Sequence, residues 1–278
     1  MSAPLRLTVV MCRRTAVGSV VGSLVGSAAA VGLIGGQLTL ARRRIPRACT
    51  LPPVTDGTAW VAPGADRRRR ALRVAFLGDS MAAGYGVDSP AQTLGAQVAM
   101  RLSAATRRTV AVRNVAAVGA RSRDLRGQLE RLDGKPELAV IVVGANDVTH
   151  HCLRADAVRH LALVVHRLLA SGTAVVVATC PDVGTLPTLV EPLRSLARHR
   201  ARQLAAAQAV AARRAGGRVV ALADLGPSFL RKPDMFGPDR FHPSAAGYAL
   251  AAELVAGAAL GALDPPPATP AAPPARAA

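Results

Sequence analysis

The 278-residue sequence contains few aromatic residues and few cysteines, and almost all of its cations are arginines. Aromatic side chains make up 3% of the chain, so a buried core must consist mainly of Ala, Val and Leu. The four cysteines are too few for a disulfide scaffold, and none lies in a CxxC pair. Cys152 and Cys180 could meet if neighbouring loops carry them, although two separate buried thiols are the favoured interpretation. Half of the residues are hydrophobic, which excludes a wholly disordered protein.

Negative charge is also scarce, because 17 Asp and Glu residues stand against 35 Lys and Arg residues, a net charge of +18. Nucleic-acid binders usually combine a basic stripe with aromatic platforms or with a helix that reads a groove. In this chain the arginines are spread out and aromatic residues are rare, so no specific nucleic-acid partner is predicted. Attraction to anionic lipid headgroups is at least as compatible with the charge.

Charged residues are absent from residues 15–41, which are rich in Gly, Ser, Ala and Val. As a helix, this segment would be longer than the ~30 Å hydrocarbon core of a bilayer, so it predicts a membrane anchor. The competing prediction is a cleavable signal peptide, with an A-x-A site at residues 28–30. The anchor is favoured because the uncharged stretch continues past this site to three arginines at 42–44. Arginines flank both ends of the segment, so the sequence does not predict the side of the membrane.

Composition divides the chain into four parts. We expect a signal or anchor segment at 1–41, a Pro- and Arg-rich linker at 42–71, a folded domain at 72–263 and a disordered Pro- and Ala-rich tail at 264–278. The protein is therefore expected to be membrane-anchored or exported. Its oligomeric state is not predicted.

Short apolar runs alternate with helical periodicity in the predicted domain. The runs are nearly continuous in hydrophobic residues, which is typical of strands covered on both faces. The predicted strands are Leu72–Leu77, Thr109–Val115, Leu138–Val143, Thr173–Thr179 and Arg218–Ala223. The predicted helices are at about 91–105, 122–132, 155–170, 190–215 and 244–260. This alternation indicates an α/β fold with a parallel sheet, and such sheets bind ligands beyond the carboxyl ends of their strands.

A serine and an acid–histidine pair have the spacing that nucleophilic catalysis requires. Ser80 lies in the turn after the first predicted strand, where either a nucleophile or a simple helix N-cap would fit. Asp239 precedes His242 by three residues, so its carboxylate can reach Nδ1 of the ring and leave Nε2 free to act as a base. Gly119 and Asn146 follow the second and third strands and could donate hydrogen bonds to an oxyanion, together with the Ser80 N–H.

The order of these residues resembles the four sequence blocks of the SGNH/GDSL hydrolase family. The resemblance covers about residues 72–260 and rests on Gly78-Asp79-Ser80, Gly119, Gly144-x-Asn146-Asp147 and Asp239-x-x-His242. It implies a three-layer α/β/α sandwich with a five-stranded parallel sheet of flavodoxin-like topology, and it implies hydrolysis of esters or thioesters. Under this resemblance Ser80 is the nucleophile, and Asp239 and His242 complete a catalytic triad. Ser80, Gly119 and Asn146 would form the oxyanion hole.

The resemblance implies no cofactor, and the sequence predicts no metal site. His150-His151-Cys152 contains metal-ligating residue types, but no second group of ligands has a convincing spacing. Asp79 and Asp147 are interpreted as residues that order their own loops. The expected substrate is an acyl ester or thioester, either a small molecule or a lipid. Two alternatives stay open: an O-acyl transferase or deacetylase that acts on a cell-envelope polysaccharide with the same residues, and a non-catalytic binding domain.

If His242 is the general base, the pH dependence of kcat/KM should have a limb that rises near neutrality. Histidine is the side chain that ordinarily changes its charge in this range, and only the neutral ring can accept the serine proton. Steady-state rates with an ester substrate across about pH 5 to about pH 8 test this expectation. A flat profile would count against His242 as the base.

Overall fold

The computed structural model describes residues 32–33, 35–40 and 51–264 of the chain. Most of the predicted anchor segment, the first part of the predicted linker and nearly all of the predicted tail lie outside the described residues. Residues 35–40 are helical, and their contacts with the rest of the protein are considered below.

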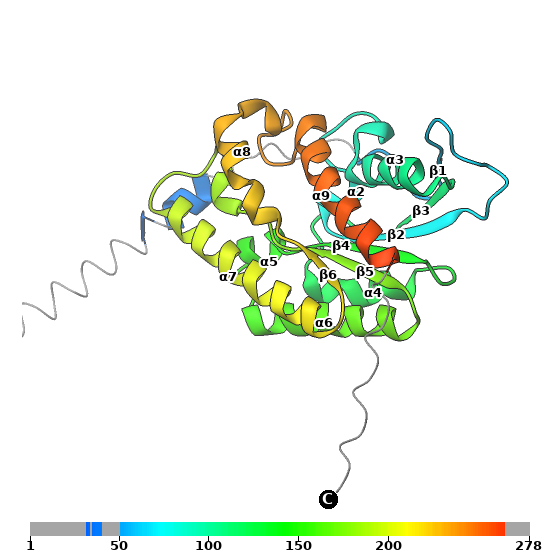
Figure 1. Cartoon of the computed structure of the whole chain (residues 1–278). Helices are drawn as coiled ribbons and strands as arrows, with labels where there is room; N and C mark the ends of the chain where they lie inside the picture. The colour runs from blue at the N-terminus through cyan, green and yellow to red at the C-terminus, as the bar shows by residue number, and fades with distance from the viewer. Residues whose placement is uncertain (1–31, 34, 41–50, 265–278) are drawn as a thin grey trace, which may run out of the picture.

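A mixed sheet of six strands forms the centre of the domain (Figure 1). Its strands are β1 (Ala59–Trp60), β2 (Leu72–Gly78), β3 (Val110–Asn114), β4 (Leu138–Val142), β5 (Ala174–Ala178) and β6 (Arg218–Val220). The order across the sheet is β1-β3-β2-β4-β5-β6, and only β1 is antiparallel to its neighbour. The five predicted strands and their flavodoxin-like parallel order are confirmed, with one additional edge strand.

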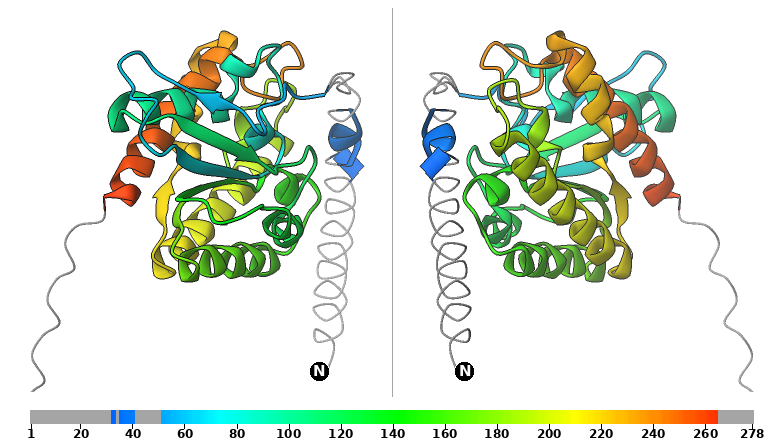
Figure 2. Two further views of the ribbon diagram at one scale, coloured as in Figure 1. Left: turned by 90° about the vertical axis from the view of Figure 1, so that its right-hand side faces the viewer. Right: turned by 90° about the vertical axis from the view of Figure 1, so that its left-hand side faces the viewer.

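Helices cover both faces of the sheet and make the predicted three layers (Figures 1 and 2). One face is covered by α3 (Leu94–Thr106) and α9 (Ala245–Leu263), and the other by α4 (Leu125–Glu130), α6 (Arg154–Ala170) and α7 (Leu193–Arg214). The sequence does not predict the short helices α2 (Ser80–Ala83), α5 (Ala145–Thr149) and α8 (Gly226–Arg231). Each has at most six residues, too few to show a clear helical period.

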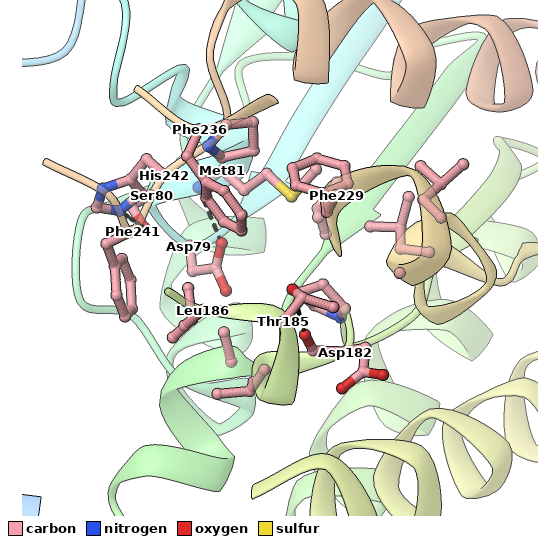
Figure 3. Close-up of a pocket in the computed structure, with 18 residues that line it drawn as sticks. Asp79, Ser80, Met81, Asp182, Thr185, Leu186, Phe229, Phe236, Phe241 and His242 are labelled. Atoms are coloured by element: carbon pink, nitrogen blue, oxygen red, sulfur yellow. Dashed lines mark hydrogen bonds between the residues drawn. The ribbon is translucent and has the colours of Figure 1, made fainter. Parts of the chain in front are cut away.

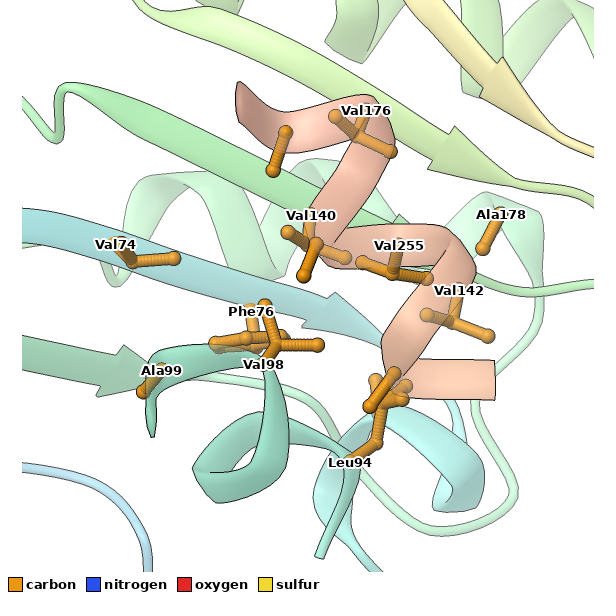
Figure 4. Packing of buried hydrophobic residues seen from close by; sticks show 14 of the residues in the cluster. Val74, Phe76, Leu94, Val98, Ala99, Val140, Val142, Val176, Ala178 and Val255 are labelled. Carbon is orange, nitrogen blue, oxygen red and sulfur yellow. The ribbon is translucent and has the colours of Figure 1, made fainter. Parts of the chain in front are cut away.

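The core consists of aliphatic side chains on the two faces of the sheet. Adjacent residues of β2 point to opposite faces: Val74 and Phe76 pack with α3 and α9, whereas Ala75 and Leu77 pack with α4, α6 and α7. Figure 4 shows the first of these clusters, which includes valines of β2, β4 and β5 together with Val98 of α3 and Val255 of α9. Apart from Phe76, its labelled side chains are Ala, Val and Leu, as the scarcity of aromatic residues predicts.

Helix α9 is long and apolar enough to cross a membrane, judged by its length and composition. Tyr248, Ala252 and Val255 on this helix are fully buried against the sheet and α3. Its hydrophobicity is therefore that of a core helix.

Residues 51–71, predicted as the second part of a linker, instead lie against the domain. Strand β1 pairs with the edge strand β3, and Thr55 and Ala62 are buried. The carboxylate of Asp56 accepts a hydrogen bond of 2.8 Å from the backbone N–H of Asn114 and pairs with Arg113. The Pro- and Arg-rich composition did not indicate this docking, because it depends on partners that are distant in the sequence.

Strand β2 ends in a glycine because the neighbouring strand leaves no room for a side chain. A Cβ atom on Gly78 would lie 1.8 Å from the carbonyl oxygen of Val142, and the φ angle of Gly78 is +135°. The two central strands therefore approach each other closely where they end, at the point where the strand order reverses.

Gly78→Ala should lower the free energy of unfolding by about 3 kcal/mol or more, because the strand ends must separate and the backbone angle is strained. Gly127→Ala is the matched control, since a Cβ there meets no atom within 4 Å and the residue lies on the exposed side of α4. That change should raise stability by about 0.5–1 kcal/mol through helix propensity. Urea unfolding measures both. A Gly78→Ala protein as stable as the wild type would contradict the close contact.

Candidate active site

Three side chains that are distant in the sequence meet at the carboxyl end of the sheet. Nε2 of His242 lies 2.8 Å from Oγ of Ser80, although the two residues are 162 positions apart. Nδ1 of the same ring lies 2.5 Å from Oδ2 of Asp239. Carboxylate, imidazole and hydroxyl therefore form one continuous hydrogen-bonded chain, the arrangement that activates a serine hydroxyl.

Ser80 is presented by the turn between β2 and α2, and the helix is capped by its neighbour. Oδ1 of Asp79 accepts a hydrogen bond of 3.0 Å from the N–H of Met81, so Asp79 is the N-cap. Ser80 is thus the first residue of the helix, and its hydroxyl is bonded to His242 rather than to the helix terminus. This distinguishes between the two interpretations that the sequence allowed for Ser80. The side chain of Asp79 orders the turn, as expected from the sequence.

The carboxyl group of Asp79 is fully buried, and burial raises its pKa to about 7. The nearby charge of Asp147 adds to this effect, while the hydrogen bond from Met81 opposes it. Burial therefore disfavours a charge on the carboxyl group that caps the helix of the nucleophile.

His242 is held by its own loop and by a neighbouring turn. Oδ1 of Asp239 accepts hydrogen bonds of 2.9 Å from the backbone N–H groups of both Phe241 and His242. Ring centroids of Tyr85 and Phe241 lie 4.5 and 4.8 Å from that of the imidazole. A Cβ on Gly86 would lie 2.6 Å from Cβ of His242, so only glycine permits this approach. These contacts fix the ring orientation.

The environment of Asp239 favours its charged form. Partial burial alone would raise its pKa, but the hydrogen bonds from the His242 ring and from the backbone of His242 and Phe241 together lower it. Asp239 therefore remains a carboxylate that can orient the imidazole and stabilise its protonated form.

Asn146 lies beside the loop that carries Gly119. Nδ2 of Asn146, at the start of α5, donates a hydrogen bond of 3.0 Å to the carbonyl oxygen of Ala120. The carboxylate of Asp147 accepts hydrogen bonds from Ser122, at 2.9 Å from the hydroxyl and at 3.1 and 3.2 Å from the N–H. The two loops are therefore joined by two adjacent side chains, and Asp147 has the loop-ordering contacts expected from the sequence.

An apolar pocket opens beside Ser80 and His242 (Figure 3). Its volume is about 80 Å³, below the roughly 300–1,000 Å³ usual for small-molecule sites, and it is partly open to solvent. Its lining is mostly aliphatic and aromatic: Met81, Val142, Ala145, Pro181, Val183, Leu186, Leu222, Leu225, Phe229, Phe236, Phe241 and Pro243. Asp182 also lines it, but its carboxylate is bonded to Gly184, Arg198 and Arg202. Such a surface suits an apolar substituent of a substrate.

Cys180, which lies buried after β5, is not a candidate nucleophile. Cys152 and Cys180 are both free thiols, as in the favoured interpretation, but Cys180 is buried whereas Cys152 is half-buried. Burial raises the pKa of Cys180 well above its ordinary value, and the carboxylates of Asp79, Asp147 and Asp182 raise it further. Its reactive thiolate form is therefore disfavoured.

The two adjacent histidines make other contacts. Nδ1 of His150 lies 2.9 Å from the carbonyl oxygen of Asn146, and Nδ1 of His151 lies 2.6 Å from Nη1 of Arg200. Within residues 32–33, 35–40 and 51–264, no group of three or more His, Cys, Asp or Glu residues could hold a metal ion.

Two buried glutamines, which no sequence motif indicated, hold the strand ends. Oε1 and Nε2 of Gln128 bond the N–H and the carbonyl oxygen of Gly78, each at 2.7 Å. Gln208 accepts from the N–H of Cys180 at 2.8 Å and donates to the carbonyl oxygen of Val143 at 3.0 Å. Both glutamines are on the apolar faces of their helices, and this break in the apolar pattern was the available signal.

Comparisons with known proteins agree with this arrangement. Residues 76–250 match the model of the GDSL-like Lipase/Acylhydrolase family. The GDSL-like esterase Rv1075c of Mycobacterium tuberculosis is 37% identical over 262 residues, which cover 91% of this chain and 82% of the relative.

Solved structures have the same fold. A lipase/acylhydrolase from Enterococcus faecalis superposes with a TM-score of 0.53 and 25% identity, over 70% of this chain and 98% of that chain. AlinE4, an SGNH-hydrolase family esterase, gives a TM-score of 0.51 and 20% identity over the same shares. The chain is thus an α/β carboxylic ester hydrolase. It belongs to the GDSL-like lipase/acylhydrolase family, whose members are also called SGNH hydrolases.

The buried Asp79 carboxyl should make stability depend on pH. The pKa of Asp79 in the folded state is about 7, above its ordinary value of 3.8. The stability that protonated Asp79 contributes is therefore complete below pH 3.8 and is lost as the pH rises through about 7. Between about pH 5 and about pH 8 this loss should reach at most about 1.4 kcal/mol per pH unit. Asp79→Asn should flatten that slope in urea unfolding experiments.

Asp239→Asn is the matched control for this experiment. Its pKa is lowered in the folded state, so its contribution is present above the ordinary value and is lost only at more acidic pH. The slope between about pH 5 and about pH 8 should therefore remain in this variant. An unchanged slope in Asp79→Asn would show that Asp79 is not the titrating group.

Proposed function

We propose that this esterase hydrolyses carboxylic esters with Ser80 as nucleophile, His242 as general base and Asp239 as the residue that orients the imidazole. The observation that carries the proposal is the chain of hydrogen bonds, 2.8 Å from Ser80 to His242 and 2.5 Å from His242 to Asp239. His242 takes the hydroxyl proton while Oγ forms a bond to the acyl carbon. The bond between that carbon and the leaving oxygen or sulfur then breaks.

We assign stabilisation of the tetrahedral oxyanion to the N–H groups of Ser80 and Gly119 and to Nδ2 of Asn146. The Ser80 N–H is in the first turn of α2, where N–H groups have no acceptor within the helix. The hydrogen bond from Asn146 to Ala120 supports the pairing of Asn146 with the Gly119 loop. Donors fixed by such contacts can stabilise charge that develops in the transition state.

The second half of the reaction uses the same groups. Protonated His242 gives its proton to the departing alcohol or thiol, and the acyl group remains on Ser80. A water molecule then gives a proton to His242 and attacks the acyl carbon, and the acid is released with the proton returned to Ser80. Hydrolysis of thioesters would require no additional residue.

The apolar pocket supports an acyl chain as the group bound beside the nucleophile. Phe229, Phe236 and Leu186 line it, together with Met81 directly after Ser80. Burial of each methylene group in such a surface stabilises the complex by about 0.8 kcal/mol. The proposed substrates are therefore esters whose acyl chain is long enough to enter the pocket.

We further propose that the domain is tethered to a membrane through the uncharged N-terminal segment. Gln37 and Leu38 contact the domain, so a span would lie in residues 15–34. At ~1.5 Å per residue these 20 residues measure ~30 Å, which still matches a hydrocarbon core. The support for this tether is the absence of charge in the segment.

A fluorophosphonate probe, which labels activated serine hydroxyls, tests the proposed roles. The wild-type protein should be labelled and should hydrolyse p-nitrophenyl esters, and Ser80→Ala should lose both properties. Asn146→Ala should lower kcat by about 10²–10³-fold while the serine remains present for labelling. Ser228→Ala, in α8, is the control and should be labelled like the wild type. Labelling that persists in Ser80→Ala would exclude Ser80 as the nucleophile.

A further inference from the structure

Residues 35–40 are bound to the catalytic domain through the backbone that precedes α7. Nε2 of Gln37 donates a hydrogen bond of 2.7 Å to the carbonyl oxygen of Glu191, and Oε1 accepts one of 3.2 Å from the N–H of Leu193. The two contacts use both ends of one side-chain amide, and they join residues more than 150 positions apart. The segment is thus held at a defined register on the domain.

The start of α7 has a structural requirement that Gln37 meets. The N-cap of this helix is Pro192, which makes no side-chain capping bond. Leu193 is the first residue of the helix, and the N–H groups of a first turn have no acceptor within the helix. Gln37 therefore supplies, from a distant segment, the acceptor that a Ser or Asp N-cap usually provides.

Leu38 adds an apolar contact next to the same helix end. It is half-buried and packs against the loop cluster, which we define as the buried apolar group that includes Val183, Leu186, Leu189 and Leu193. Leu40, two residues further on, is 45% exposed. The helical segment therefore presents one side to the domain and another to solvent.

The loop cluster also contributes to the lining of the active-site pocket. Val183 and Leu186 belong to it and at the same time line the pocket beside Ser80. They lie in the connection from β5 to α7, of which Glu191 is the residue that Gln37 holds. Residues 37 and 38 thus contact the same β5–α7 connection and loop cluster that supply Val183 and Leu186 to the pocket.

We propose that residues 35–40 form a docking segment that braces the β5–α7 wall of the pocket and thereby sets the preference for acyl-chain length. Gln37 and Leu38 are positioning residues: they act on the substrate through Val183 and Leu186. This inference rests on the proposed function, because it takes the pocket to be the acyl site. The docking segment follows the predicted A-x-A site at residues 28–30, so cleavage there would leave it on the mature protein.

The chain-length profile of the full-length protein tests the proposal. A loosened wall should weaken contacts that only a longer acyl chain makes, whereas an acetyl group does not extend to the wall. Leu38→Ala should therefore lower the ratio of kcat/KM for p-nitrophenyl octanoate to that for p-nitrophenyl acetate by about threefold to tenfold, mainly through KM. Gln37→Ala should change the ratio in the same direction. Leu40→Ala, the same substitution on the exposed side, should leave it unchanged.

Hydrogen exchange gives a readout that does not depend on activity. Backbone amides in peptides covering residues 183–196 should exchange faster in Leu38→Ala and Gln37→Ala than in the wild type or Leu40→Ala. Faster exchange with an unchanged chain-length ratio would overturn the proposal, because the segment would then only stabilise the loop. An unchanged exchange rate, or an equal effect of Leu40→Ala, would overturn it as well.

The outcomes also separate this inference from the proposed function. If Ser80→Ala keeps esterase activity, the proposed nucleophile is wrong, whatever the docking variants do. If Ser80→Ala is inactive and Leu38→Ala has the wild-type profile, the nucleophile stands and the docking segment has no role in specificity.

Discussion

The close contact of β2 and β4 at their carboxyl ends is the constraint on which the active site depends. The N–H of Asp79 bonds the carbonyl oxygen of Val142 at 3.0 Å, so the sheet remains hydrogen-bonded up to the residue before the nucleophile. Gln128 of α4 hydrogen-bonds both the N–H and the carbonyl oxygen of Gly78. Ser80 therefore begins its helix from a point fixed by the sheet, and the Asp239–His242 loop brings the imidazole to it.

The sequence alone predicted the strands and the longer helices, whose hydrophobic patterns are local and extend over several residues. Five strands were visible as apolar runs, and the longer helices as a helical period, because burial on one or both faces dictates those patterns. Ser80 and Asn146 could be placed at one edge of the sheet because each follows a parallel strand. The pairing of Asp239 with His242 could be predicted because they are three positions apart.

Apart from the Ser80–His242 pair, which the family resemblance implied, contacts between distant segments could not be predicted from the sequence. Strand β1 has two residues, and its pairing with β3 depends on an exposed edge rather than on its own propensity. Gln208 is the polar residue among the buried side chains of α7, and only the fold shows that it bonds the ends of two strands. The same holds for Gln37, whose partners lie more than 150 residues away. Local patterns carry no information on such partners.

The carboxyl groups of Asp79 and Asp239 both lie near Ser80, but their environments shift the two pKa values in opposite directions. The pKa of Asp79 is raised to about 7 because the group is buried, whereas hydrogen bonds lower the pKa of Asp239 despite its partial burial. A charge on Asp239 therefore stabilises an imidazolium at low cost, while a charge on Asp79 is disfavoured at the same edge of the sheet. Asp79 orders the turn that holds Ser80 through its hydrogen bond from the N–H of Met81, whereas Asp239 is the carboxylate bonded to the histidine.

The scarcity of aromatic residues acquires a structural meaning once their positions are known. The core is aliphatic, and most of the few rings lie at the site: Phe229, Phe236 and Phe241 line the pocket, and Tyr85 packs on His242. The hydroxyl of the buried Tyr248 donates a hydrogen bond of 2.5 Å to the carbonyl oxygen of Tyr85. Helix α9 is thereby tied to the turn that supports the imidazole. Rigid side chains with few rotamers are thus concentrated where a ring or a substrate must be held in one orientation, while Ala, Val and Leu fill the remainder of the core.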